Sequence, residues 1–331
     1  MSIQVTIVGL GQIGASIGMG LASQKQIVRV GHDMEPATVR KAEKMGAVDK
    51  VYIQLARAVR DANVVILALP VDQIKETLEF IAPELKPETV VIDTAIAKEA
   101  VVEWARQVLP ERRYYIGMTP VINPVYLMDG DWGIEAAHAD LFKNGLFAIV
   151  APPPASSEAI RLAAELATLL GAEHMFTDVT EIDGLMASTD LLPQLVAMAL
   201  GGMTIGKPGW QEGRKLAGRP FAKVTEPAVS GDPAMALAEA SVNNRKNATR
   251  VIDTLVSVLL DIRAEIEAGD VAALEARFTS VREGRMNWWK ERWSANWAAR
   301  ERDSGAEIPK ASEWMGRLIG TYRPRDKQPK K

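Results

Sequence analysis

Short runs of β-branched and other apolar residues recur through the first half of the chain, and stretches with helical spacing separate them. The runs lie at residues 5–8, 28–31, 64–69, 90–93, 114–117 and 146–150. The stretches between them, such as residues 36–45 and 74–81, place apolar residues every three or four positions. One further unit follows, with a helix from about Ser156 to Leu170 and a short strand at residues 174–176. This alternation predicts a parallel sheet covered by helices on both faces.

The second half of the chain has no strand pattern. Long helices are expected at residues 181–201, 234–268 and 271–300, with a Gly/Pro-rich segment at residues 201–233 between the first two. A chain of 331 residues suits two domains at about 150 residues each. We therefore predict an α/β domain over residues 1–178, an all-α domain over residues 179–322 and a polar, basic tail over residues 323–331.

Composition narrows the possible chemistry. The chain has 39 Lys and Arg residues against 42 Asp and Glu residues, a net charge of −3 that is too balanced for nucleic-acid binding. It has no cysteine, so disulfides, thiolate metal sites and cysteine nucleophiles are excluded. The three histidines, His32, His138 and His174, are too few for an ordinary multi-histidine site, and we expect no metal.

Targeting and membrane segments are not expected. A strand pattern starts almost at the first residue, without a basic and apolar leader ahead of it. The longest uncharged stretch, residues 191–206, contains Pro193 and Gln194 and is shorter than the roughly 20 apolar residues of a membrane span. The sequence therefore predicts a cytoplasmic protein.

A glycine pattern follows the first predicted strand and opens a helix at residues 15–22. The expected cofactor-binding residues here are Gly9, Gly11, Gln12, Ile13 and Gly14. In this context the first glycine permits a tight turn, the second lets the backbone approach a pyrophosphate, and the third lets the helix pack closely on the sheet. The helix N-terminus then offers free N–H groups to the phosphates. The loop predicts a dinucleotide site, and a purely structural turn is the alternative.

An acidic residue supports the dinucleotide interpretation. Asp33 lies 19 residues after Gly14, at the end of the second predicted strand, where a carboxylate accepts hydrogen bonds from the adenosine ribose. A carboxylate there repels a 2′-phosphate, which favours NAD, although the nearby Arg40 and Lys41 can weaken this preference and NADP stays open. On the nicotinamide side, strand exits supply the remaining expected cofactor contacts: Leu69, Pro70, Val71 and Thr94.

The chain resembles the prephenate and arogenate dehydrogenases. The segments that carry the resemblance are the glycine loop, residues 68–71, 93–98, 115–120 and 140–142, Leu192-Pro193, and Gly231-Asp232-Pro233 ahead of a long helix. The resemblance implies an α/β Rossmann-like dinucleotide-binding domain followed by an all-α C-terminal dimerisation domain. It also implies NAD(P)-dependent oxidative decarboxylation of prephenate or arogenate, in tyrosine biosynthesis.

Several positions depart from the family pattern. The catalytic histidine of a Gly-x-His-Pro motif is Thr119 here, and Ile96 stands where the family's Asp-x-x-Ser-x-Lys segment has serine. Asp190 and Gln194 begin and end the segment that matches Ser-His-Leu-Pro-His. Glu226 aligns with a carboxylate-binding arginine. These changes make an altered substrate a reasonable expectation.

Candidate catalytic groups are therefore few. A threonine hydroxyl at Thr119 can orient a substrate but cannot act as a general base near neutral pH. Asp190, at the expected start of a helix facing the nicotinamide, is the candidate base, and a structural helix-terminal carboxylate is its alternative. His138 is a weaker candidate. A basic segment can supply the cation that a substrate carboxylate needs, and its residues are Arg214, Lys215, Arg219 and Lys223. The alternative is a substrate that carries an amine or lacks a second carboxylate.

Tryptophans mark one face of the last predicted helix. Trp289, Trp293 and Trp297 recur every four residues, with Trp288 beside the first. We expect this stripe to pack on the chain's own helices or on a second copy, and a homodimer through the C-terminal helices follows.

Two functions remain in competition at this point. The first is an NAD(P)-dependent oxidoreductase acting on a small-molecule substrate. The second is a non-catalytic NAD-binding dimer that serves as a sensor or partner protein, because the family's serine, histidine and arginine positions are all changed.

Overall fold

The computed structural model describes residues 2–295, and the chain divides into two compact units, Met1–Leu274 and Glu275–Lys331. The first unit contains the whole sheet and every expected site residue. Trp297 and the tail at residues 323–331 lie outside the described residues. Along the part of the chain that is described, no helix is long and apolar enough to cross a membrane.

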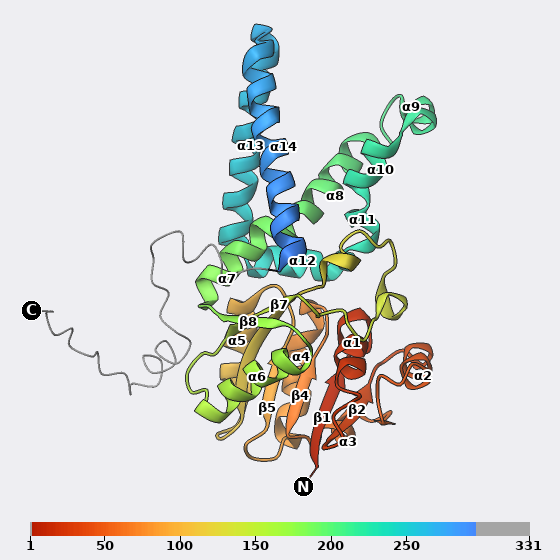
Figure 1. Ribbon diagram of the computed structural model, residues 1–331, viewed down its shortest axis with the longest axis vertical. Helices are drawn as coiled ribbons and strands as arrows, with labels where there is room; N and C mark the ends of the chain where they lie inside the picture. The colour runs from red at the N-terminus through yellow and green to blue at the C-terminus, as the bar shows by residue number, and fades with distance from the viewer. Residues whose placement is uncertain (1, 296–331) are drawn as a thin grey trace, which may run out of the picture. The chain divides into compact units, whose positions relative to one another are not determined.

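A single eight-stranded sheet forms the centre of the first unit, in the order β3-β2-β1-β4-β5-β6-β7-β8 (Figure 1). The strands are β1 (Ile3–Val8), β2 (Ile27–His32), β3 (Lys50–Val51), β4 (Val64–Leu67), β5 (Val90–Asp93), β6 (Tyr114–Val121), β7 (Leu146–Val150) and β8 (Glu173–Phe176). The two halves β1-β2-β3 and β4-β5-β6 wind outward from the β1–β4 pair, which is the doubly wound arrangement.

The prediction of an all-parallel sheet is wrong at one pair. Strand β7 runs antiparallel to β6, while all other neighbouring strands are parallel. The connection at residues 122–145 contains only short 3₁₀ turns, Pro124–Tyr126 (η2) and Gly133–Ala136 (η3). Without a crossover helix, the chain returns beside β6 in the opposite direction. Strand β3 was not predicted either, because two residues are too few to show a period.

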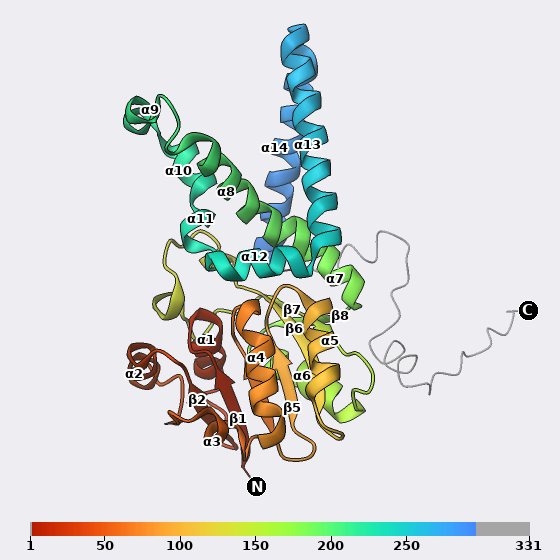
Figure 2. The same ribbon diagram turned by 180° about the vertical axis from the view of Figure 1, so that it is seen from behind.

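Helices cover both faces of the sheet. The helices are α1 (Gln12–Gly20), α2 (Pro36–Lys44), α3 (Leu55–Val59), α4 (Val71–Ile81), α5 (Lys98–Val108) and α6 (Ser157–Leu169). Helices α3, α4 and α5 share one apolar core with β4 and β5, and α4 and α5 lie in front of the sheet in Figure 2. Helices α1 and α6 approach each other on the opposite face, where Leu170 lies against Gly20.

The rest of the first unit is helical, as the sequence predicts, with different boundaries. It contains α7 (Val179–Met186), a π-helical turn (Ala187–Leu191), α8 (Leu192–Thr204), α9 (Trp210–Leu216), α10 (Arg219–Thr225), α11 (Pro227–Ser230), α12 (Ala234–Asn243) and α13 (Arg245–Ala268). The segment at 201–233 is therefore largely helical, and the helix expected over 234–268 is broken at Asn244. The last described helix, α14 (Val271–Ser294), crosses the boundary between the two units.

These helices contact the sheet domain through α7, α12 and the start of α13. Helix α7 packs on α5, and α12 packs on α4. Since α4 and α5 begin at the carboxyl ends of β4 and β5, the helical part meets the sheet at the edge where doubly wound proteins bind their ligands.

Candidate active site

The glycine loop has the backbone that a dinucleotide cradle needs. Gly9 adopts φ +88°, a left-handed conformation that favours glycine. A Cβ on Gly14 would lie 1.9 Å from the Gly9 carbonyl oxygen, so no side chain fits between the loop and α1. A Cβ on Gly11 would meet nothing within 4 Å, which leaves open space at the start of α1. The N-terminal N–H groups of α1 have no side-chain cap, and together these features fit a bound pyrophosphate.

Asp33 is fixed beside this loop. Its Oδ2 accepts a hydrogen bond from the Leu10 N–H at 2.7 Å, and its Oδ1 accepts one from the Glu35 N–H at 2.8 Å. Both oxygens keep a free lone pair, because a carboxylate oxygen accepts about two hydrogen bonds. The structure thus brings the predicted ribose-binding carboxylate to the predicted phosphate-binding loop.

The exits of β4 and β5 lie next to the same loop. A Cβ on Gly9 would lie 2.4 Å from the Ala68 carbonyl oxygen and 2.9 Å from the Leu69 side chain. Pro70 caps α4, and Thr94 donates its N–H to the Leu67 carbonyl at 3.2 Å. The residues expected on the nicotinamide side therefore surround the carboxyl ends of β1, β4 and β5.

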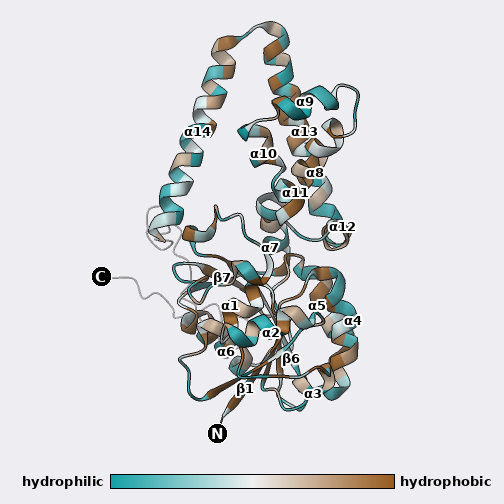
Figure 3. Cartoon of the chain, turned by 90° about the vertical axis from the view of Figure 1, so that its right-hand side faces the viewer, coloured by the Kyte–Doolittle hydropathy of each residue, from teal (hydrophilic) through white to brown (hydrophobic). Residues whose placement is uncertain are grey.

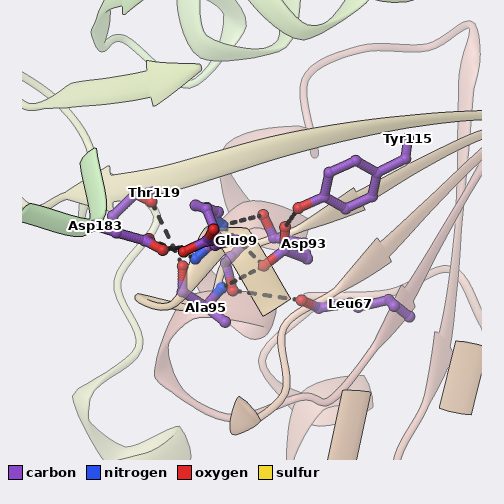
Figure 4. A network of polar contacts seen from close by, with 9 residues as sticks. Leu67, Asp93, Ala95, Glu99, Tyr115, Thr119 and Asp183 are labelled. Carbon is purple, nitrogen blue, oxygen red and sulfur yellow. Dashed lines mark hydrogen bonds and ion pairs between the residues drawn. The ribbon is translucent and has the colours of Figure 1, made fainter. Parts of the chain in front are cut away.

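A fully buried charged network lies below the β5 exit (Figure 4). The Asp93 and Lys98 side chains are 0% exposed, and Lys98 Nζ lies 2.8 Å from Asp93 Oδ1. The Tyr115 hydroxyl donates to Asp93 Oδ2 at 2.5 Å. Burial lowers the pKa of Lys98, and burial followed by the Asp93 charge raises the pKa of Tyr115 well above its usual value. Asp93 Oδ1 also accepts the Ala95 N–H at 2.9 Å, which links these three side chains to the loop at residues 94–97.

Asp183 of α7 ties this network to the helical part. Its two carboxylate oxygens accept the N–H groups of Lys98 and Glu99 at 2.7 and 2.9 Å, which caps α5. The Asn244 side chain donates to the Asp183 carbonyl at 2.8 Å. Burial raises the pKa of Asp183. No local sequence pattern marks this role, because the contacts join residues about 60 to 85 positions apart.

Thr119 lies on β6, and its side chain is 1% exposed. Its hydroxyl donates to the Ala95 carbonyl over a long 3.5 Å. The hydroxyl therefore faces the loop held by Asp93 and Lys98, as Figure 4 shows. Its contact with a substrate stays a prediction.

Asp190 belongs to a second polar cluster, which comprises Asp190, Gln194 and Asp232. The Gln194 amide donates to Asp190 Oδ1 at 2.9 Å and to Asp232 Oδ2 at 3.3 Å, and it accepts the Asp232 N–H at 2.9 Å. Burial, and then the neighbouring Asp232 charge, raises the pKa of Asp190 to about 6. Burial also raises the pKa of Asp232. The Gln194 side-chain amide thus hydrogen-bonds two half-buried carboxylates, those of Asp190 and Asp232.

The expected position of Asp190 at a helix start is wrong. It lies inside the π-helical turn that joins α7 to α8. Pro193 lacks the N–H that would bond back to residue 189, and a π turn is one way in which a helix passes such a gap. Asp190 therefore has helical backbone before it, in α7, and after it, in α8.

Sequence reasoning missed Asp72, which lies in the first turn of α4. Its Oδ1 is buried without a hydrogen-bond partner among the described residues, and its charge contributes to the raised pKa of Asp232. Asp72 directly follows the expected nicotinamide contacts Pro70 and Val71, so it links the Asp190 cluster to the cofactor side. Its place right after the strand exit was the available signal.

Between the two networks lies a hollow of about 160 Å³. Ile96 contributes to it, and the other lining residues are Ala97, Met186, Ala187, Leu191, Ala240 and Asn244. The hollow is lined mainly by apolar side chains, and Ile96 lies in it where the family pattern has a serine.

The histidines all have contacts outside the two networks. His32 Nδ1 lies 2.9 Å from the Tyr52 carbonyl oxygen, the His138 ring stacks on Tyr126 at 4.1 Å, and the His174 ring meets Phe176 edge-on at 5.6 Å. Within residues 2–295 no group of three or more His, Asp or Glu side chains is arranged to hold a metal ion.

The basic segment and Glu226 lie on the surface. Glu226 is exposed at the junction of α10 and α11, and the four basic side chains expected to supply a cation are exposed as well: Arg214, Lys215, Arg219 and Lys223. Of the tryptophans, Trp288 and Trp293 are 44% and 51% exposed.

The fold and the loop define a Rossmann-type dinucleotide-binding protein. The family model described as prephenate dehydrogenase, nucleotide-binding domain, matches residues 20–182. The chain is 25% identical over 284 residues to the prephenate dehydrogenase of Bacillus subtilis, which covers 85% of this chain and 75% of that protein. It is 26% identical over 205 residues to the cyclohexadienyl dehydrogenase of Zymomonas mobilis, covering 61% and 67%. The family model and these relatives together support a place for the chain in the prephenate/arogenate dehydrogenase family.

Solved structures agree on the fold. The crystal structure of prephenate dehydrogenase from A. aeolicus, in complex with hydroxyphenyl propionate and NAD+, matches with a TM-score of 0.75 at 21% identity, covering 87% of this chain and 98% of that one. The chain spans 52% to 75% of the length of the curated relatives. The family model's match begins after the glycine loop, so the loop's assignment rests on its own geometry.

Proposed function

We propose that the protein is an NAD-dependent dehydrogenase that oxidises a cyclic hydroxy acid, with prephenate and arogenate as the first substrates to test. The observation that carries the proposal is the glycine loop with Asp33 hydrogen-bonded to it, in a chain of this family. The relatives are named prephenate and cyclohexadienyl dehydrogenases. One relative's structure contains NAD+, which supports NAD as the cofactor.

The residues that would hold the cofactor have distinct tasks. The start of α1, opposite the open space at Gly11, would receive the pyrophosphate, and Asp33 would accept the ribose hydroxyls. The exits of β4 and β5, with Leu69, Pro70 and Thr94, would face the nicotinamide. When bound, the nicotinamide supplies the hydride acceptor, and the protein's own groups must take the hydroxyl proton.

Asp190 is the residue we assign to proton transfer. A carboxylate with a pKa of about 6 is mostly ionised at neutral pH and is still basic enough to accept a proton in a transition state. Burial raises that pKa and the Asp232 charge adds to the rise, while the Gln194 amide hydrogen-bonds both carboxylates. Thr119, through the Ala95 carbonyl, would help fix the loop at 94–97 over the substrate.

A pH profile tests this assignment. We expect kcat/KM to fall below about pH 6, and D190N to lose about 10²-fold to 10⁴-fold in kcat while keeping its affinity for NADH. D232N removes the repelling charge, so the acid limb should move to lower pH. The exposed D61N serves as the matched control and should leave the profile unchanged. An unchanged rate in D190N would exclude Asp190 as the base.

A non-catalytic NAD-binding protein is the less favoured alternative. The apolar hollow supports it, because Ile96 lies there in place of the family's hydrogen-bonding serine. The dehydrogenase relatives argue against it. NADH binding by calorimetry without turnover of prephenate or arogenate, also in a T119H variant, would favour this alternative.

A homodimer through the C-terminal helices is also part of the proposal. Large apolar side chains are exposed along α13, and Figure 3 shows hydrophobic residues along its length. These residues are Ile252, Val256, Val258, Leu259, Leu260 and Ile266, exposed by 39% to 61%. Such a row favours burial against another helix surface. Sedimentation of the full chain should give twice the 36.0 kDa chain mass, and L259E/L260E should shift it toward one chain.

A further inference from the structure

The loop between β6 and β7 crosses from α1 to α2. On one side, the Gln12 amide at the first turn of α1 donates to the Ala136 carbonyl at 3.2 Å. The His138 N–H donates to Ser16 Oγ of α1 at 2.9 Å. On the other side, Glu135 of η3 forms an ion pair with Lys41 of α2. The 3₁₀ turn η3 is therefore fastened to the two helices that follow the glycine loop and Asp33.

This placement matters for the charges around the adenosine ribose. A 2′-phosphate needs a cation close to the end of β2. Helix α2 starts just after Asp33, and its two adjacent cations are Arg40 and Lys41. Lys41 is 32% exposed and its charge is matched by Glu135, while Asp33 and Glu35 add negative charge on the same side. The ion pair leaves this region with one cation fewer for a phosphate.

We propose that Glu135 is a cofactor-specificity residue that disfavours NADP by holding Lys41 in an ion pair, so that this cation is withheld from a 2′-phosphate. The inference rests on the proposed dinucleotide-binding function. Asp33 already disfavours a 2′-phosphate through its charge. Glu135, in a loop 102 residues further along the chain, adds a second means of excluding it.

The size of the effect follows from the exposure of the pair. Glu135 is 66% exposed, and exposed ion pairs contribute up to about 1 kcal/mol, which corresponds to about a fivefold change in affinity. We expect E135Q to improve binding of NADPH relative to NADH by about threefold to fivefold. The gain should shrink as ionic strength rises.

The test is a double-mutant cycle read by calorimetry with NADPH and NADH on the full chain. The variants are E135Q, K41Q and E135Q/K41Q, and E88Q is the control because it breaks another surface ion pair, Glu88–Arg112. E135Q should shift the NADPH/NADH affinity ratio, E88Q should leave it unchanged, and the gain should disappear in E135Q/K41Q.

Two results overturn the inference, and they differ from failure of the proposed function. A ratio in E135Q within about twofold of wild type, or a gain that survives without Lys41, removes Glu135 from cofactor selection while NADH binding stands. If the wild-type protein binds neither dinucleotide, both the inference and the proposed function fail.

Discussion

Asp190 should make the protein less stable as the pH rises, and D190N should remove this effect. Burial raises the pKa of Asp190 from 3.8 to about 6, so the folded protein favours the protonated carboxyl. For an acid with a raised pKa, the stabilising contribution is complete below the unfolded value and is lost as the pH rises through the folded value. A rise from 3.8 to about 6 corresponds to about 3 kcal/mol at pH 8.

Asparagine keeps the shape and removes the charge. Its side-chain oxygen can still accept the Gln194 amide hydrogen that Asp190 accepts at 2.9 Å. At pH 8, D190N should therefore be more stable than wild type, and the difference should shrink by about 2 to 3 kcal/mol on going to pH 4. Comparing the two pH values cancels any constant effect of the substitution.

Urea-induced unfolding at pH 4, 6 and 8 measures this difference. The control is D61N, an exposed aspartate, which should change the free energy of unfolding by less than about 0.5 kcal/mol at each pH. A D190N effect that is independent of pH would show that Asp190 keeps an ordinary pKa, and the reasoning behind its role as a base would fail with it. A variant that gains stability and loses turnover would show the usual trade between stability and activity at functional sites.

Two further predictions concern the sheet edge. G14A should weaken NADH binding in calorimetry by about tenfold or more, because its Cβ would lie 1.9 Å from the Gly9 carbonyl oxygen and force α1 away. The control G130A, where a Cβ meets nothing within 4 Å, should bind NADH as wild type does. Equal NADH affinities of G14A and wild type would contradict the role of the glycine loop in binding the dinucleotide. K98M should lose about 3 to 5 kcal/mol in urea unfolding, because Asp93 stays buried without its cation, whereas R112M at an exposed pair should lose less than about 1 kcal/mol. D93N/K98M should recover part of the K98M loss, and a K98M cost as small as that of R112M would refute the account of the buried pair.

The dinucleotide half could be predicted from the sequence because its signals are local. The glycine loop directly follows β1, and Asp33 ends the neighbouring strand, so strand order alone brings them together. The direction of β7 could not be predicted, since a period of two marks a strand but not the way it runs. The missing helix at residues 122–145 was the only indication.

The substrate side was harder, because its contacts join distant parts of the chain. Gln194 and Asp232 lie 38 residues apart, across a segment that the sequence indicated to be irregular. Glu135 and Lys41 meet through a loop with no repeating pattern. Asp190 was identified as a candidate from its position in a motif, but its raised pKa depends on burial and on Asp232, which only the folded chain brings beside it.

The most direct test of the account is the reduction of nicotinamide, followed by absorbance, when the purified full chain is mixed with prephenate or arogenate and either NAD or NADP. The account predicts reduction of NAD with at least one of the two substrates, faster than reduction of NADP, and loss of this activity in D190N. No reduction with any of the four pairs, from a protein that binds NADH in calorimetry, would contradict it.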